Sequence, residues 1–294
     1  ERSRGLGDVY KRQMSVTISA NVLVRNEIKH VDAFVRNMID ACIDEVIFWD
    51  GGSSDGTYER LLEYKVKYPY LRVLHWEQPE GSEYKQGFNE VARRNLMIEA
   101  SSMDWCLYID IDERVPIDFK SRLEEKTMSS VLLVAFPRYH FWQNGIRVNM
   151  SDDKVWYPDL NYRLFRRDQR LRFGSHDANG LHNYLLYKGK RVMGGFNKAK
   201  VIYTAIQLRN RCLLSLLGGV KILNNNNVCV FHLHYYDLST PKINDLRRRE
   251  FDNEIKIVSS ENGGLSYQLQ DKIVPCIPVS NVYGAQIIIE RYIK

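Results

Sequence analysis

Hydrophobic residues follow two alternating periods along the first third of the chain, and this alternation limits the possible folds more than any other feature. Residues 16–24 carry apolar side chains at every second position, the period of a β-strand. Residues 31–42 carry them three and four positions apart, the period of an amphipathic helix. The same succession continues through residues 45–49, 57–68, 71–76, 86–100 and 105–109. Such alternation builds right-handed βαβ units, so we expect an α/β fold with a mostly parallel sheet.

Polar and acidic residues directly follow three of these expected strands. Asn26 and Glu27 follow the first strand, Asp50 ends the second, and Asp110 and Asp112 follow the fourth. Ligands of open parallel sheets bind at the carboxyl ends of the strands, which predicts a binding site at this edge. Two carboxylates spaced two residues apart can point to one side, and their hard oxygen atoms suit Mn²⁺ or Mg²⁺.

The glycine-rich segment 50–57 must be compared with known phosphate-binding loops. Gly51 and Gly56 have the spacing of a P-loop, but the lysine that contacts the phosphates is absent. The dinucleotide fingerprint also fails, because Ser53 occupies its third position. The remaining interpretation is a turn that caps the next helix, and Asp55 fits a helix cap better than a ligand.

The pattern changes after about residue 130. Residues 131–136 and 139–142 read as strands around Pro137, residues 156–174 as a β-rich segment, and residues 205–217 as a possible helix. No linker separates two independent domains. Residues 1–13 show neither period, so we expect a non-native, disordered tail before Met14.

Composition and charge exclude several functional classes. Hydrophobic residues make up 44% of the chain, enough for a large core, and no run approaches the roughly 18 apolar residues of a membrane-spanning helix. The five cysteines include no CxxC pair, which argues against a disulfide framework or zinc knuckle and favours a cytoplasmic location. The net charge of +6 suits phosphorylated substrates or peripheral contact with an anionic membrane, but it does not predict nucleic-acid binding.

Taken together and in order, these motifs resemble the catalytic domain of glycosyltransferase family 2, which has the GT-A fold. The resemblance covers roughly residues 15–115 and is carried by Asn26-Glu27, the segment 44–57, Arg94-Asn95, Asp104-Trp105 and Asp110-Ile-Asp112-Glu113. A looser match, through segments 156–159 and 163–167, resembles the acceptor-side half of bacterial and viral members. Residues 190–230 match no known pattern. The resemblance implies one Rossmann-like GT-A domain, with a nucleotide-sugar-binding half over residues 14–115 and a mixed α/β acceptor-binding half over residues 116–294.

The resemblance also implies an activity and a set of site residues. The activity is metal-dependent hexosyl transfer from a nucleotide-sugar, UDP-linked, to a hydroxyl group of a glycan, lipid-linked or other acceptor, with inversion. Asp110 and Asp112 would hold Mn²⁺ or Mg²⁺, with His234 as the third ligand; satisfied core histidines are the alternative for His234 and for His232, two positions earlier. The nucleotide-sugar would be bound by Asn26, Glu27, Asp50, Arg94, Asn95 and Asp110. A solvated helix face is the alternative for Arg94 and Asn95, and capping of the turn is the alternative for Asp50.

Inverting members use a carboxylate to take the proton of the acceptor hydroxyl group. Asp177, in the segment Gly174-Ser-His-Asp177, is the nearest match to the family's acidic residue after a histidine. Asp159 and His182-Asn183 stay open as alternatives for this role.

Two other functions compete with this interpretation. A GT-A-like nucleotidyltransferase would carry a glycine-rich basic loop after its first strand, and residues 25–29 lack the glycines. A non-catalytic carbohydrate-binding module would have no leaving-group charge to neutralise, so a paired Asp110 and Asp112 argue against it.

Overall fold

The computed structural model describes most of the chain between residues 16 and 293. The described ranges are 16–75, 90–123, 131–142, 145–147, 149–151, 154–156, 159–175, 183–191, 213–217, 220–224, 228–235, 255–259, 265–269, 272–275 and 277–293. The expected tail over residues 1–13 lies outside them.

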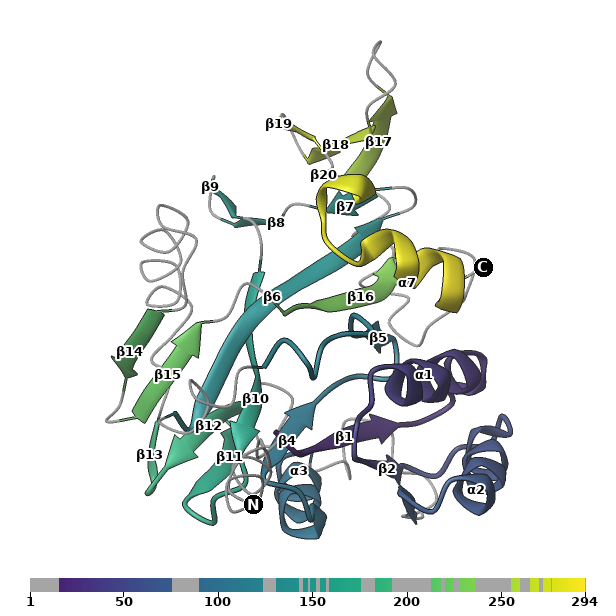
Figure 1. Cartoon of the computed structure of the whole chain (residues 1–294). Helices are drawn as coiled ribbons and strands as arrows, with labels where there is room; N and C mark the ends of the chain where they lie inside the picture. The colour runs from purple at the N-terminus through teal and green to yellow at the C-terminus, as the bar shows by residue number, and fades with distance from the viewer. Residues whose placement is uncertain are drawn as a thin grey trace, which may run out of the picture.

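Twelve of the described strands form one large sheet, flanked by helices (Figure 1). The helices are α1 (Ile28–Asp40), α2 (Thr57–Lys67), α3 (Glu90–Ala100), α7 (Ala285–Tyr292) and the short 3-10 turn η1 (Val279–Asn281). The strands of the large sheet are β1 (Ile18–Val24), β2 (Glu45–Asp50), β3 (Leu71–His75), β4 (Trp105–Tyr108), β5 (Glu113–Arg114), β6 (Leu133–Trp142), β7 (Gly145–Arg147), β10 (Asp159–Arg166), β14 (Leu213–Leu217), β15 (Val220–Asn224), β16 (Val230–Tyr235) and β20 (Ile277–Pro278). Smaller sheets contain β8 (Asn149–Ser151), β9 (Lys154–Trp156), β11 (Leu171–Ser175), β12 (Asn183–Tyr187), β13 (Lys190–Arg191), β17 (Ile255–Ser259), β18 (Leu265–Leu269) and β19 (Lys272–Pro275).

The first four strands lie in the order β4-β1-β2-β3, and all three pairings are parallel. Helices α1 and α2 pack on one face, where Ile18 of β1 shares a core with Phe34 and Leu61. Helix α3 packs on the other face, where Ile98 shares a second core with Cys106 of β4. The chain therefore changes faces between β1 and β4, and ligands of doubly wound sheets bind at such a switch point.

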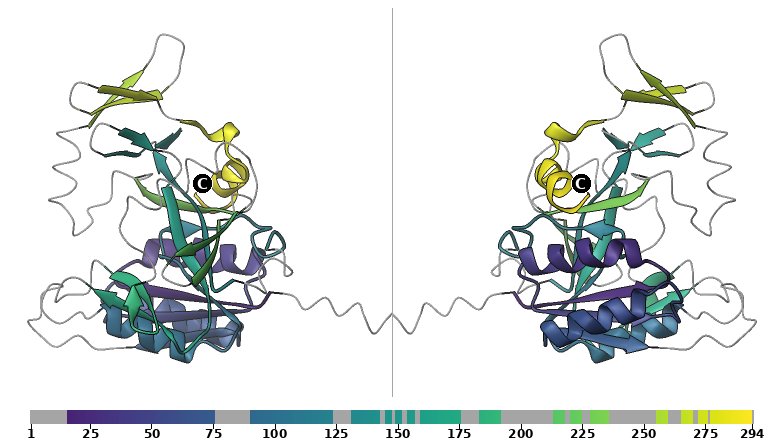
Figure 2. Two further views of the ribbon diagram at one scale, coloured as in Figure 1. Left: turned by 90° about the vertical axis from the view of Figure 1, so that its left-hand side faces the viewer. Right: turned by 90° about the vertical axis from the view of Figure 1, so that its right-hand side faces the viewer.

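Strand β6 organises the second half of the sheet (Figure 2). On one edge it pairs in parallel with β15 and then β16, and on the other it pairs antiparallel with β10 and then β7. Two strands were predicted on either side of Pro137, but β6 runs through this residue. The proline is tolerated because the parallel partner changes there, from β15 at Ala135 to β16 at Arg138. The possible helix over residues 205–217 is wrong where it can be checked, since Leu213–Leu217 form β14, paired with β15.

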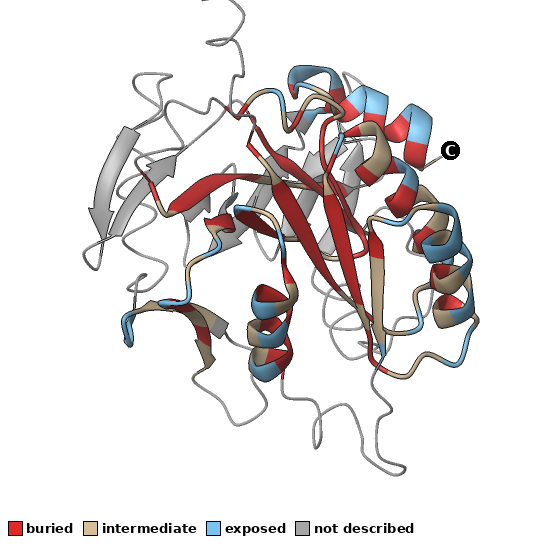
Figure 3. Ribbon diagram, turned by 60° about the horizontal axis from the view of Figure 1, so that its bottom comes forward, coloured by how far each residue is buried: buried red, intermediate tan, exposed pale blue. Residues whose placement is uncertain are grey.

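Strands β1, β2 and β4 of the first half are mostly buried, the edge strand β3 is partly exposed, and the helices expose their outer faces (Figure 3). At the other end of the molecule, α7 closes a third core in which Ile288 and Val282 pack with Phe141 of β6 and Phe231 of β16. No helix in the described ranges has both the length and the apolar character needed to cross a bilayer. The expected α/β class is confirmed: the βαβ half is wholly parallel, and the second half is mixed.

Candidate functional site

Asn26 connects the end of β1 to the turn that follows β2. Its backbone has a φ of 53°, in the left-handed region that asparagine enters more easily than most residues. Its N–H donates to Ser53 Oγ at 2.9 Å, and its Oδ1 accepts from the N–H of Ser54 at 2.8 Å. The next residue, Glu27, donates its N–H to Thr57 Oγ1 at 2.9 Å. These bonds hold the carboxyl ends of β1 and β2 together.

Asp50, the last residue of β2, is fully buried beneath the turn that follows it. Its Oδ2 accepts from the N–H groups of Gly52 and Ser53 at 3.0 Å each, and His75 Nδ1 lies 3.0 Å from the same oxygen. Its Oδ1 accepts from the Ser53 hydroxyl at 2.5 Å. Gly52 has a φ of 78°, a conformation that side chains disfavour. Asp50 therefore shapes this turn, and its contact with a nucleoside stays a prediction.

Asp55 joins the N-termini of two helices. Its Oδ2 accepts from the N–H of Ile28, at the start of α1, and its Oδ1 accepts from the N–H of Thr57, at the start of α2, at 3.1 and 3.0 Å. Burial raises the pKa of Asp55, but the hydrogen bonds from Thr57 and Ile28 outweigh it and leave the pKa below 3.8. This is the capping role expected from the sequence.

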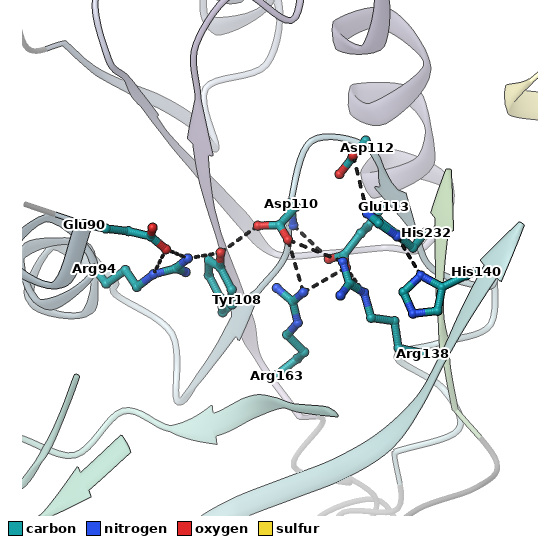
Figure 4. Close-up of polar contacts among 10 residues, drawn as sticks. All are labelled: Glu90, Arg94, Tyr108, Asp110, Asp112, Glu113, Arg138, His140, Arg163 and His232. Atoms are coloured by element: carbon teal, nitrogen blue, oxygen red, sulfur yellow. Dashed lines mark hydrogen bonds and ion pairs between the residues drawn. The ribbon is translucent and has the colours of Figure 1, made fainter. Parts of the chain in front are cut away.

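Asp110 follows β4 and is clamped from three directions (Figure 4). Its Oδ1 accepts from the Tyr108 hydroxyl at 2.6 Å, and its Oδ2 accepts from Arg163 Nη2 at 3.1 Å. Its backbone N–H donates to Glu113 Oε2 at 2.9 Å. Burial raises the pKa of Asp110, but the positive charges of Arg163 and Arg138 outweigh it, so the pKa lies below 3.8. Asp110 is therefore ionised and fixed in orientation.

Glu113 holds the two arginines that surround Asp110. Its Oε1 lies 2.9 Å from Arg163 Nη2 and 2.7 Å from Arg138 Nε, and its side chain is fully buried. Burial raises the pKa of Glu113, and the two guanidinium groups oppose that shift. Because Arg163 belongs to β10 and Arg138 to β6, this one carboxylate ties two strands of the second half to the loop after β4.

Asp112 lies beside a histidine, which in turn contacts a second one. His232 Nε2 of β16 lies 3.5 Å from Asp112 Oδ2, and His232 Nδ1 lies 2.8 Å from Nδ1 of His140 on β6. Burial lowers the pKa of His232 well below 6.5, Arg138 lowers it further, and Asp112 opposes the shift. His232 is therefore neutral near pH 7, the form of imidazole that binds metals.

Arg94 reaches this cluster from α3. Its Nε donates to Glu90 Oε1 at 2.7 Å, its Nη2 donates to the Tyr108 hydroxyl, and its guanidinium carbon lies 3.4 Å from the centre of the Tyr108 ring. Burial lowers the pKa of Arg94, while Glu90 and Asp110 oppose that effect. The solvated-face alternative is therefore wrong for Arg94. Its neighbour Asn95 bonds the backbone of Phe173 on β11 instead, at 2.8 and 3.1 Å.

Several expected site residues fall outside the described part of the chain. Asp177 lies outside it, and so do the side chains of His234 and Asp159, although β16 and β10 include the backbone of these two residues. Within the described ranges, no three His, Cys, Asp or Glu side chains gather as ligands around one point. Asp112 and His232 supply two ligands of suitable chemistry, so the remaining ligands of a bound ion would come from elsewhere.

No site role was predicted for Glu113, Arg138, His140 or Arg163, and His232 was predicted to be a core residue. A signal was present for two of them, because Arg138 and His140 interrupt the otherwise apolar stretch 131–142. A buried charge requires a partner of opposite sign, and the acidic strand end at residues 110–113 was one candidate. The sequence did not show which strands would lie beside that end.

Similar solved structures include TarS of S. aureus (14% identity, TM-score 0.41, covering 56% of this chain and 32% of TarS). They also include glucosyl-3-phosphoglycerate synthase from Mycobacterium tuberculosis, in complex with Mn²⁺, UDP and glucosyl-3-phosphoglycerate (21% identity, TM-score 0.31, covering 43% of this chain and 44% of that one). A third is GalNAc-T7 with UDP, GalNAc and Mn²⁺ (14% identity, TM-score 0.40, covering 81% of this chain and 48% of that one). The chain thus spans between 32% and 48% of the length of these three proteins. No curated protein matches it.

The family comparison covers more than half of the chain. The model for glycosyl transferase family 2 matches residues 19–188, which include β1 to β4, the carboxylates after β4, and the arginines of β6 and β10. It therefore spans the parallel half and the strands that bring partners to its edge. The chain belongs to glycosyl transferase family 2.

Proposed function

We propose that this protein transfers a sugar from a UDP-linked nucleotide-sugar to a hydroxyl group of a glycan, lipid-linked or other acceptor, with inversion and with the help of Mn²⁺ or Mg²⁺. Family membership supports the class of reaction. The observation that carries the proposal is the position of Asp112: a carboxylate at the carboxyl end of β4 faces a neutral imidazole, 3.5 Å away, beside the switch point of a parallel sheet.

The residues at this edge fit a divalent cation in part. Asp112 offers a hard carboxylate oxygen and His232 a neutral nitrogen, and Mn²⁺ accepts both. The positive charges of Arg138, Arg163 and the buried Arg114 lie near these carboxylates, so the ligand chemistry of the cluster, and not its net charge, supports a cation here. When bound, such an ion would supply the positive charge that stabilises a diphosphate leaving group. Asp112 and His232 would hold the ion, with His234 as the sequence-based alternative to His232.

Asp110 takes a different part in this proposal. Its two oxygens are occupied by Tyr108 and Arg163, so it serves better to orient the donor than as a free metal ligand. Arg94 supports it through Tyr108. Asn26 and Glu27 would flank the nucleoside at the end of β1. Asp50 accepts hydrogen bonds from the turn after β2, and Asn95 bonds the backbone of β11. Their contacts with the sugar donor stay predictions.

Asp177 is our candidate for the general base. Strand β11 ends at Ser175, two positions before it, and Phe173 of β11 packs against Tyr108 with ring centres 6.2 Å apart. Ser175 is thus the last described residue before Asp177, on a strand that packs against the Tyr108 ring. Asp177→Asn should lower transfer by orders of magnitude while UDP affinity stays nearly unchanged, because the base acts on the acceptor. Normal transfer by this variant would move the role to Asp159 or His182.

Calorimetric titration with UDP, with and without Mn²⁺, tests the proposal, alongside a panel of nucleotide-sugars screened for Mn²⁺-dependent donor hydrolysis. Asp112→Ala should abolish turnover and Mn²⁺-dependent UDP binding together. The matched control is Asp32→Ala, which removes a carboxylate paired with Arg60 on the helical surface and should leave both unchanged. UDP binding and turnover that survive both chelation and Asp112→Ala would contradict the proposal.

A further inference from the structure

His140 and His232 form a buried pair on neighbouring strands, on the side of His232 that faces away from Asp112 (Figure 4). They are register partners in the parallel pairing of β6 with β16. Their Nδ1 atoms are 2.8 Å apart, their rings meet edge to face at 84°, and each residue is only 8% exposed. The distance is that of a hydrogen bond between two ring nitrogens.

This contact restricts where the ring protons lie. A neutral imidazole carries one proton and one lone pair on its two nitrogens, so one Nδ1 must donate and the other must accept. If His140 donates, the proton of His232 is on Nε2 and points toward Asp112. If His232 donates, its Nε2 presents a lone pair toward Asp112 instead. Only the second arrangement leaves Nε2 able to bind a metal.

We propose that His140 is a positioning residue for His232: it holds the Nε2 atom of His232 toward Asp112 and accepts a hydrogen bond from the Nδ1–H group of His232 when that Nε2 binds a divalent cation. The inference rests on the proposed function, which supplies the cation. In passing between the two arrangements, the Nδ1 proton of His140 crosses to Nδ1 of His232. One proton leaves Nε2 of His232 and one joins Nε2 of His140, so both rings stay neutral and the number of protons is unchanged.

The orientation of the ring matters as much as its proton. A histidine ring that turns over about its Cβ–Cγ bond exchanges Nδ1 with a carbon and Nε2 with another carbon. If Nδ1 of His232 had no hydrogen-bond partner in His140, this contact would not favour the ring orientation that points Nε2 toward Asp112 over the one that points a carbon atom toward it. The hydrogen bond that His232 donates to His140 selects one orientation, and acceptors of this kind also raise the basicity of a ligating imidazole.

The test measures Mn²⁺ binding to the full chain by the electron paramagnetic resonance of free Mn²⁺, with nitrogen modulation of the spin echo as the signature of a bound imidazole. His140→Leu removes the ring nitrogen at similar volume and should weaken Mn²⁺ binding about 10- to 100-fold, with loss of the nitrogen signal. His140→Asn places an amide oxygen where Nδ1 lies and should recover most of both. Phe141→Leu, the matched control, disturbs the packing of Phe141 on Phe231 in the same pair of strands and should change neither.

The outcomes separate this inference from the function on which it rests. Parental affinity and nitrogen signal in His140→Leu would overturn the role of His140, provided that Asp112→Ala still abolishes binding. Equal losses in His140→Leu and Phe141→Leu, or no recovery in His140→Asn, would overturn it as well, because either result means that only packing matters. A parent protein that binds no Mn²⁺, or binds it independently of Asp112, would contradict the proposed function and this inference together.

Discussion

The two halves of the large sheet contribute differently to the site. The parallel half, β4-β1-β2-β3, presents its polar residues at strand ends, where Asp50, Asp110 and Asp112 follow or end buried strands. The second half presents its polar residues from inside strands: Arg138 from β6 and His232 from β16. For Asp110 and Asp112, the parallel half therefore supplies the carboxylates, and the second half supplies a guanidinium group and an imidazole beside them.

This division explains why two carboxylates only two residues apart differ so much. Asp110 is clamped by Tyr108 of β4 and by Arg163 of β10, while Asp112 lies beside the neutral ring of His232 (Figure 4). A carboxylate whose oxygens both accept strong hydrogen bonds is suited to positioning. A carboxylate beside a neutral imidazole is suited to binding a cation.

The largest expected effect comes from breaking the connection between the halves. Glu113→Gln removes the charge that both Arg138 and Arg163 face, which should lower the free energy of unfolding by about 3–5 kcal/mol, because it leaves buried guanidinium groups uncompensated. Urea denaturation followed by circular dichroism measures it. The control is Glu99→Gln, which breaks a surface pair with Arg172 and should change stability by less than about 1 kcal/mol. Similar values for the two variants would contradict a special role for Glu113.

A smaller loss of stability is expected from breaking the contact between α1 and Val115, the residue that directly follows β5. Asn37 is fully buried, and its amide bonds both the carbonyl and the N–H of Val115, at 2.8 and 2.9 Å. Asn37→Leu leaves both backbone groups without these bonds and should lower the free energy of unfolding by about 2–4 kcal/mol. Arg36→Gln, on the exposed side of the same helix, should stay within about 0.5 kcal/mol of the parent. Equal denaturation midpoints for the two variants would show that this contact is unimportant.

Tyr108→Phe tests the clamp on Asp110 without changing the packing of the ring. The hydroxyl bridges Arg94 and Asp110, so its loss should lower the free energy of unfolding by about 1–2 kcal/mol and reduce transfer through a higher KM for the donor. Tyr283→Phe removes an exposed hydroxyl that bonds Asp118 at 2.7 Å and should affect neither. If Tyr108→Phe had a normal KM, the orientation of Asp110 would not depend on this bond.

The smallest effect concerns pH, and it lies wholly within the parallel half. Burial raises the pKa of Glu45, but hydrogen bonds from Ser19, Ser102 and Arg72 outweigh it and leave the pKa below 4.5. A depressed pKa stabilises the fold fully above pH 4.5, and the contribution falls as the pH drops through the lower folded value. Unfolding free energies measured from pH 7 to pH 3 should therefore decline more steeply for the parent than for Glu45→Gln, by about 1 kcal/mol. Parallel curves would contradict the lowered pKa.

Sequence periodicity was sufficient for the parallel half, because each βαβ unit is built from neighbouring segments. The strands ending near Asn26, Asp50 and Asp110 were all predicted, and so was the capping role of Asp55. In the second half, β6 gathers partners from residues far apart in the chain. Their register cannot be derived from local patterns, which is why His232 and His140 were not predicted to meet.

The most direct measurement is a double-mutant cycle for Mn²⁺ affinity in the presence of UDP, using Asp112→Ala, His232→Ala and the double variant. If one carboxylate from the parallel half and one imidazole from the second half bind a single ion, each substitution should weaken Mn²⁺ binding, and the double variant should lose less than the two single losses combined. His234→Ala, made in parallel, should have a smaller effect than His232→Ala. Full additivity, or Mn²⁺ affinity that does not change in His232→Ala, would contradict a site shared between the two halves.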